Sequence, residues 1–145
     1  MELQRLMAFM KKSEAVYQKY CNEIIKKWDL NATSFGVLMF LANNPEHNTA
    51  RDVCRMGGIK TGIASISVDH LIRAGYIRRE TDPEDRRIQR LFVEDKAGEV
   101  IRQGRESQTE FLKTVTGALT PEERAVYFRL TDKIMDQINE MEQEM

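Results

Sequence analysis

The stretch VDHLIRAGYIRRETDPEDRRIQRLFV, residues 68–93, decides the fold. Its first part places Val68 and Leu71 on one side of a helix, and Gly75 is the residue type that commonly ends a helix. The segments YIRRET and IQRLFV then alternate or run apolar as strands do, and the turn-forming residues of DPEDRR join them. The stretch therefore predicts the end of a helix followed by a two-stranded hairpin.

Two further helices are predicted before this stretch. A first apolar helix follows a candidate cap at Asn31, Thr33 or Ser34, and Asn43-Asn44-Pro45 stops it. Thr49 with Asp52 three residues later resembles a capping box and would open a second, short helix, which Gly57-Gly58 ends. Helix, turn, helix and hairpin in this order make a winged helix-turn-helix, here over about residues 33–93.

Both ends of the chain are also predicted to be helical. Over residues 2–28, apolar side chains recur at intervals of three and four, as in a heptad seam. The seam consists of Leu3, Met7, Met10, Tyr17, Cys21, Ile24 and Trp28, with the polar Glu14 taking the position between Met10 and Tyr17. A helix over residues 94–119 and another that begins at Thr120-Pro121 form the last third, which again carries an apolar stripe. Stripes at both ends of a compact middle predict that the ends meet around the two-fold axis of a dimer.

The overall composition limits the class of protein. A chain of 145 residues with 41% hydrophobic and 31% charged residues indicates one folded, helix-rich domain. Cys21 and Cys54 are too few for a disulfide framework, and the start MELQRLMAFMKK lacks the pattern of a signal peptide. No apolar run approaches the length that spans a membrane. We therefore expect a cytoplasmic protein with no membrane contact.

The net charge of -1 hides an uneven distribution. Residues 51–90 hold nine Lys or Arg against six Asp or Glu, whereas residues 91–145 hold seven against twelve. The middle of the chain therefore carries the positive excess. Taken by itself, this excess is a weak sign of a polyanionic partner.

The arginines of TDPEDRRIQR, residues 81–90, have two interpretations. The simpler one is an exposed hairpin whose arginines pair with neighbouring acids, and it suits any one of them taken alone. A turn can also extend an arginine into a DNA minor groove, where a narrow groove concentrates negative potential. The position directly after a helix-turn-helix pattern favours this second interpretation. Asp82 and Asp85 would then orient the arginines by pairing with them.

The order of these elements, with VDHLIRAGYIRRE followed by DPEDRR and LFV, resembles the MarR family of bacterial transcription regulators. The resemblance covers nearly the whole chain. It implies a single domain, residues 1–145, that forms a homodimer through intertwined terminal helices, residues 1–30 and 95–145. Residues 31–94 would form the winged helix-turn-helix that binds a near-palindromic operator in double-stranded DNA, most simply as a repressor.

The resemblance also assigns site residues. It places the recognition helix at Lys60 to Ala74 and the wing's Asp-x-Arg pattern at Asp85 and Arg87, and Arg87 is expected to enter the minor groove. The residues expected to face the bases are Thr61, Gly62, Ser65 and Ile66, with Ile63 beside them. The candidates for phosphate contacts are Lys60, Arg73, Arg78, Arg79 and Arg90, and Arg86 lies within the wing pattern.

Two residues depart from the family's pattern. Ile66 stands where a polar or basic side chain is common, which weakens the case for hydrogen-bonded readout and leaves open an apolar contact with a thymine methyl. Gly57 stands where leucine is usual at the end of the preceding helix. The packing of the helix-turn-helix corner is therefore less well defined by the sequence.

The family's small-molecule pocket, between the dimer helices and the DNA-binding lobe, is implied as well. Met10, Tyr17, Trp28 and Phe35 are the candidates to line it and to take a small aromatic or phenolic effector, although such a stripe is more commonly ordinary core. Some members sense oxidants through an N-terminal cysteine. Cys21 lies within the apolar seam, so we expect it to serve in packing.

Catalysis finds little support in the sequence. There is no Gly-x-Ser-x-Gly, no phosphate-binding glycine loop and no His-Glu-x-x-His, and His47 and His70 lack partners at metal-ligand spacing. We therefore predict a mainly α fold with a small β wing and no enzyme activity, cofactor or metal. The predicted function is sequence-specific transcription regulation. The alternative, suggested by the net charge and by the apolar Ile63 and Ile66, is a winged-helix dimer that contacts proteins and not DNA.

Overall fold

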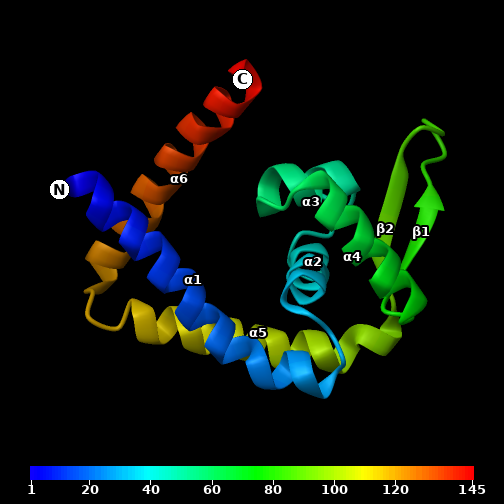
Figure 1. Ribbon diagram of the computed structural model, residues 1–145, viewed down its shortest axis with the longest axis horizontal. Coiled ribbons are helices and arrows are strands. Elements are labelled where there is room, and N and C mark those ends of the chain that lie inside the picture. Colours follow the sequence, from blue (N-terminus) through cyan, green and yellow to red (C-terminus); the bar gives the residue numbers. More distant parts are fainter. The chain divides into compact units, whose positions relative to one another are not determined.

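The computed structural model describes residues 1–145 and shows a mainly helical chain with one small antiparallel sheet (Figure 1). In chain order, the elements are α1 (Glu2–Lys27), α2 (Ala32–Asn43), α3 (Ala50–Gly57), α4 (Thr61–Arg73), β1 (Ile77–Thr81), β2 (Gln89–Val93), a 3-10 helix (Asp95–Ala97), α5 (Gly98–Val115) and α6 (Pro121–Glu144). The predicted fold class is confirmed. None of the helices combines the length and the apolar character that crossing a membrane requires.

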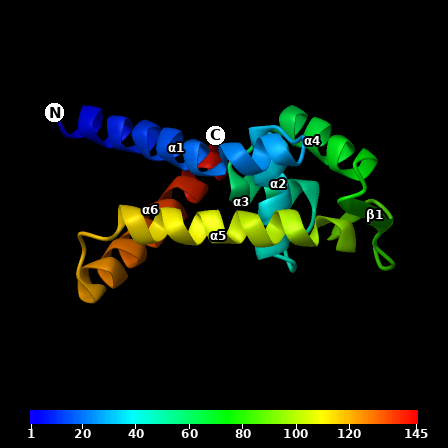
Figure 2. The same ribbon diagram turned by 90° about the horizontal axis from the view of Figure 1, so that it is seen from below.

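The chain forms two compact units, residues 1–109 and residues 110–145, and the boundary lies within α5. The first unit holds the helix-turn-helix and the wing. Its centre is α2, against which α1, α3, α4 and β2 all pack (Figures 1 and 2). A helix that is covered on all sides must be apolar all round. This explains the run FGVLMFLA, in which Phe35, Leu38 and Met39 are almost completely buried.

The apolar seam of α1 divides into two halves. In its second half Cys21 and Ile24 are buried and Tyr17 is half-buried, whereas Leu3, Met7 and Met10 in the first half are exposed. Two hydrogen bonds tie the buried half to α5. Gln108 Nε2 donates to the Tyr17 hydroxyl at 3.0 Å, and Trp28 Nε1 donates to Gln103 Oε1 at 3.2 Å.

The capping residues explain where the helices begin. Asn31, one of the three predicted candidates, caps α2 by accepting a hydrogen bond from the Ser34 amide at 2.8 Å. Thr49 and Asp52 form the predicted capping box of α3, and Gly58 ends that helix in the left-handed region with φ of 68°. The local prediction of the helix-turn-helix is therefore confirmed.

Gly104 allows α5 to approach α2 closely. A Cβ at this position would lie 2.6 Å from Met39 Sδ and 3.1 Å from Phe35 Cζ, both of which belong to the buried core. Any larger side chain would force Met39 to move. The contact fixes α5 next to the helix-turn-helix.

The second unit is a helical hairpin made of the end of α5, a turn and α6. The prediction of one helix over residues 94–119 was wrong at both ends, because a 3-10 helix precedes α5 and a turn follows Val115. At that turn Thr116 Oγ1 donates to the Leu112 carbonyl at 2.6 Å. α6 begins at Thr120-Pro121, as the sequence predicted, and the structure adds a capping box between Thr120 and Glu123.

Candidate nucleic-acid interface

α4 presents small polar and apolar side chains to solvent. Its inner side, with Ala64, Val68 and Leu71, is buried in the core, and this fixes which side faces outward. The outer side consists of Thr61, Gly62, Ile63, Ser65 and Ile66, all of them exposed, and we call it the reading face. The structure thus brings the residues expected to face DNA bases onto one accessible surface.

Two polar contacts hold the C-terminal half of α4, the helix that carries the reading face. Ser34 Oγ, buried on α2, lies 3.2 Å from His70 Nδ1. At the C-terminal end Lys96 Nζ donates to the Ala74 carbonyl at 2.7 Å. Gly75 then turns the chain toward the wing with φ of 80°, a conformation that side-chain-bearing residues rarely adopt.

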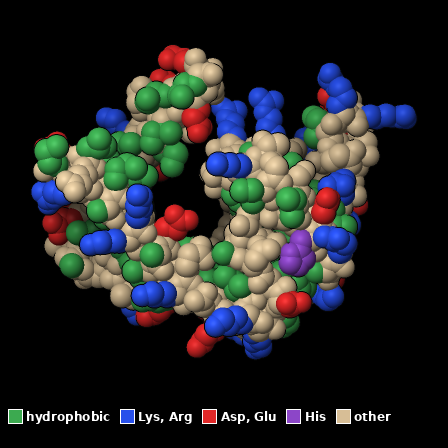
Figure 3. Space-filling model, viewed as in Figure 1, with side chains coloured by type: hydrophobic (Ala, Val, Ile, Leu, Met, Phe, Trp, Pro, Cys, Tyr) green, Lys and Arg blue, Asp and Glu red, His purple; other side chains and the backbone are tan.

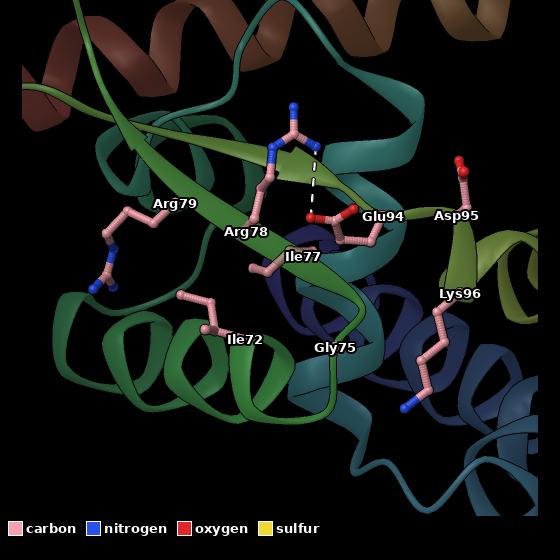
Figure 4. A pocket seen from close by; sticks show the side chains of 8 residues that line it. All are labelled: Ile72, Gly75, Ile77, Arg78, Arg79, Glu94, Asp95 and Lys96. Carbon is pink, nitrogen blue, oxygen red and sulfur yellow. Dashed lines mark ion pairs between the residues drawn. The ribbon is translucent and has the colours of Figure 1, made fainter.

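A shallow pocket of about 630 Å³ lies where α4 meets the base of the wing (Figure 4). Figure 4 shows Arg78 and Glu94 facing each other, with Arg78 Nη1 3.7 Å from Glu94 Oε1, whereas Arg79 points away from them. Arg78 also pairs with Glu80 at 2.9 Å, and Arg79 pairs with Asp69 of α4 at 3.4 Å. Both arginines are therefore engaged within the chain while remaining about half exposed.

The wing is a regular hairpin in which Ile77 pairs with Val93 and Thr81 pairs with Gln89. Its turn is organised by Asp82, whose Oδ1 accepts the amide of Glu84 at 2.8 Å and that of Asp85 at 3.1 Å. The Glu84 amide, then the Arg90 guanidinium and the Asp85 amide, hold the pKa of Asp82 below its usual range. The turn is thus built around an ionised carboxylate.

Asp85 orients Arg87 at the outer end of this turn. Arg87 Nε donates to Asp85 Oδ1 at 3.1 Å, and Arg87 Nη2 donates to Asp85 Oδ2 at 3.0 Å. The side chain of Arg87 is nevertheless 90% exposed. The neighbouring Arg86 is exposed and makes no ion pair. The wing therefore ends in two accessible cations, one of them fixed in direction.

Arg90 has a different environment from the other arginines of the wing. Its Nε donates to Asp82 Oδ2 at 2.9 Å and its Nη1 donates to Asn48 Oδ1 at 3.2 Å. The backbone of Asn48 also accepts the Leu91 amide at 2.8 Å. Arg90 thus ties the wing to the segment before α3. Sequence reasoning missed Asn48, because nothing in its local pattern distinguishes it from an ordinary loop residue.

Several exposed cations near the reading face have no ion pair. They include Lys60 at the start of α4, Arg73 at its end, and Arg51 and Arg55 on α3. Figure 3 shows Lys and Arg side chains projecting beyond the end of the wing and over α3. The two α3 arginines belong to the positively charged segment 51–90, and that excess of charge was the only signal in the sequence that pointed to them.

The four residues expected to line an effector pocket do not come together. Met10 and Trp28 are 18 positions apart along one helical run, which corresponds to about 27 Å. Met10 is exposed, Phe35 is buried in the core beside Gly104, and Trp28 bonds to Gln103. Within one chain the four residues therefore do not line one cavity: Met10, Tyr17 and Trp28 are spread along the α1 stripe, and Phe35 lies on α2.

Tyr17 lines an open cavity of about 500 Å³ between α1, α2, α5 and the link from α3 to α4, and the other three residues are not among its lining. Its polar lining residues are Glu14, Tyr17, Gln18, Thr33, Asn43 and Gln108, and no Lys or Arg is among its lining residues. Burial raises the pKa of Tyr17 to about 12, so its hydroxyl stays protonated. No local pattern in the sequence points to this cavity, since its walls come from four separate segments.

Neither the histidines nor the cysteines form a reactive cluster. No group of three or more His, Cys, Asp and Glu side chains is placed to hold a metal ion. Cys21 and Cys54 are both free thiols. Cys21 is fully buried, and this burial raises the pKa of its thiol.

A short helix, a turn, a second helix with an exposed outer side and an arginine-tipped hairpin together define a winged helix-turn-helix, the fold of many transcription regulators. Comparison with known proteins narrows this class. The model of the MarR family matches residues 28–88. The transcriptional repressor MprA of Escherichia coli K12 is 27% identical over 125 residues, which cover 85% of this chain and 70% of MprA.

Two solved structures share the fold. S. aureus MepR, solved in complex with DNA, has a TM-score of 0.74 at 17% identity and covers 90% of this chain and 94% of its own. Bordetella bronchiseptica BpsR, whose DNA binding is regulated by 6-hydroxynicotinic acid, has a TM-score of 0.70 at 18% identity, with coverages of 90% and 98%. The family model and MprA support a regulator of the MarR family, and the two solved structures show that it shares their fold.

Proposed function

We propose that this regulator binds a palindromic DNA operator as a homodimer and represses transcription from it. In each protomer the reading face of α4 would enter the major groove while Arg87 enters the adjacent minor groove. The observation that carries the proposal is the state of Arg87, which is almost fully exposed at the end of the wing yet held in one direction by Asp85. The repressor activity of MprA and the DNA complex of MepR support the same function.

The basic residues of the lobe would have different roles in DNA binding. Lys60, Arg73 and Arg86 are free to neutralise phosphates, and Arg78 and Arg79 remain exposed enough to assist. Arg90, held by Asp82 and Asn48, serves to position the wing. The phosphate contacts would supply affinity that falls with salt, and the reading face would supply sequence discrimination.

The homodimer is supported by the apolar surface that the chain leaves uncovered. No residue of α6 is buried, although it carries an apolar stripe of Tyr127, Leu130, Ile134, Ile138 and Met141. The first half of α1 is similarly exposed. An amphipathic helix that is stable in water buries such a stripe, and a second copy of the chain offers the same stripe in a two-fold arrangement. The two recognition helices would then lie about 34 Å apart, one turn of DNA.

The cavity beside Tyr17 is the proposed effector site. It is lined by Gly57, Gly58 and Ile59, which lead directly into α4, so a ligand there would push on the recognition helix. Because its lining includes Glu14 and no basic residue, we propose a small aromatic effector that is neutral or cationic. A phenolate or carboxylate anion would find no partner for its charge.

Selection of bound sequences from a random duplex pool with the purified protein tests the proposed function. We expect a palindromic winner whose half-sites are centred about 10 base pairs apart and whose affinity falls steeply with salt. Absence of duplex binding even at low salt would overturn the proposal and favour the protein-contact alternative. For the effector, thermal shift with matched neutral and anionic aromatic compounds should show stabilisation by the neutral ones.

A further inference from the structure

The most unusual feature of the reading face is the isoleucine at its centre. Ile66 is 69% exposed and Ile63, three positions earlier, is 46% exposed. Ile66 lies one turn after Gly62, where a Cβ would meet nothing within 4 Å. Ile66 is therefore largely accessible to a partner, and Ile63 is partly accessible beside it.

Ile66 can recognise only one kind of base edge in the major groove. Its side chain neither donates nor accepts a hydrogen bond, and the C5 methyl of thymine is the apolar group that the unmodified bases present there. Against a cytosine or guanine edge it would leave the base's polar groups without water or a partner, which is unfavourable. A β-branched side chain also has few rotamers to lose on contact. The chemistry of the residue therefore selects thymine.

We infer that Ile66 reads a thymine in each operator half-site through its C5 methyl group, with Ile63 closing the contact on one side. Side chains three apart on a helix have Cβ atoms about 5–6 Å apart, which is between one and two base steps of roughly 3.4 Å. The pair thus covers one methyl and the adjoining step. This inference rests on the proposed function and assigns sequence specificity to a named residue.

The experiment uses the full chain and the operator obtained by selection. Each thymine is replaced in turn by deoxyuracil, symmetrically in both half-sites, and the dissociation constant is measured at fixed salt. Deoxyuracil keeps every hydrogen-bonding group and removes only the methyl. At one position we expect binding to weaken by about fourfold per half-site, or roughly 15-fold for both, as expected for one methyl group.

The variant I66A then identifies the side chain that reads this methyl. It should bind the thymine and deoxyuracil operators equally, whereas Ile66→Val keeps most of the difference. Met56→Ala, which removes an exposed apolar side chain from α3, should keep the full difference. With cytosine at the sensitive position, methylation at C5 should tighten binding of the natural protein and not of I66A.

The outcomes separate the two proposals. If no duplex is selected, the proposed function fails and this inference fails with it. If an operator is selected but no thymine is sensitive to deoxyuracil, or I66A keeps the sensitivity, only the inference is overturned. Unchanged thermal unfolding of I66A, expected for so exposed a residue, shows that the comparison is between folded proteins.

Discussion

Arg87 and Asp85 form a two-point pair at the end of the wing, with distances of 3.1 and 3.0 Å, while the arginine side chain remains almost entirely in solvent. A pair in this position contributes little to stability, because water screens it. Its effect is to hold the Arg87 side chain in one direction. Part of the entropy that a long side chain loses on binding is already lost in the free protein.

Replacement of Arg87 by alanine should weaken operator binding by more than about tenfold, because the wing loses its oriented cation. Dimerisation should not change. Fluorescence anisotropy with the operator and sedimentation measure the two properties. Arg102→Ala, which removes an ion-paired arginine of α5, is the matched control and should bind as the natural protein does. An unchanged affinity for the Arg87 variant would show that the wing arginine is only a surface charge.

The order of the wing turn should depend on pH only in the acid range. Backbone amides and Arg90 lower the pKa of Asp82 in the folded protein from its ordinary 3.8. The stabilisation is therefore fully present above pH 3.8 and is lost as pH falls through the lower folded value. Amide hydrogen exchange at Glu84 and Asp85 reports this loss. In Asp82→Ala the same amides should exchange fast already at neutral pH, and equal protection in both proteins would contradict the assignment.

Gly104→Ala should destabilise the protein by about 1–3 kcal/mol, since the new methyl overlaps Met39 in a packed core. Thermal unfolding measures the effect. Gly98→Ala is the matched control in the same helix, where a Cβ meets nothing within 4 Å, and it should leave stability equal or slightly higher. If both variants unfold at the same temperature, α5 and α2 are not in the close contact described.

Removal of all residues after Gly117 should abolish the dimer, because it deletes α6 and its uncovered stripe. Sedimentation velocity distinguishes one subunit from two. The single change Ile134→Glu, which places a charge in the middle of the stripe without shortening the chain, should weaken association in the same direction. If the truncated protein still sediments as a dimer, α6 does not form the interface. The exposed first half of α1 would then be the candidate for it.

Cys21 should resist alkylation in the folded protein. Its thiol is fully buried, and burial raises its pKa and so lowers the fraction of reactive thiolate. With a maleimide at neutral pH, we expect modification of the half-buried Cys54 first and of Cys21 only at the rate of unfolding. The Cys54→Ser variant is the control, because Cys21 is then the one thiol left. Fast modification of Cys21 in this variant would contradict its packing role and favour oxidant sensing.

The local signals of the DNA-binding lobe were predictable because they act over three or four residues. The Thr49–Asp52 box and the turn around Asp82 need only neighbours in sequence, and both are formed in the structure. The apolar run of α2 likewise contains its own explanation, since a helix without a polar side has to be buried.

Features that depend on distant segments were not predictable from one sequence. Arg90 was interpreted as a phosphate contact, yet its partner Asn48 lies 42 residues earlier in the chain. The cavity beside Tyr17 also includes Gln108, 91 residues later. Met10 and Trp28 show a different problem, because they were grouped in one pocket although they are 18 positions apart. A shared stripe says which side of a helix two residues occupy and nothing of the distance between them along its axis.

The attachment of the wing to Asn48 fixes the position of the hairpin relative to α3 and α4. Asn48 receives both the Leu91 amide and the Arg90 guanidinium, so the hairpin cannot swing freely about its base. In the proposed complex, the distance from the tip of the hairpin to the start of α4 would then be fixed. Adjustment to an operator would have to come from bending of the duplex, or from a change in the separation of the two proposed subunits.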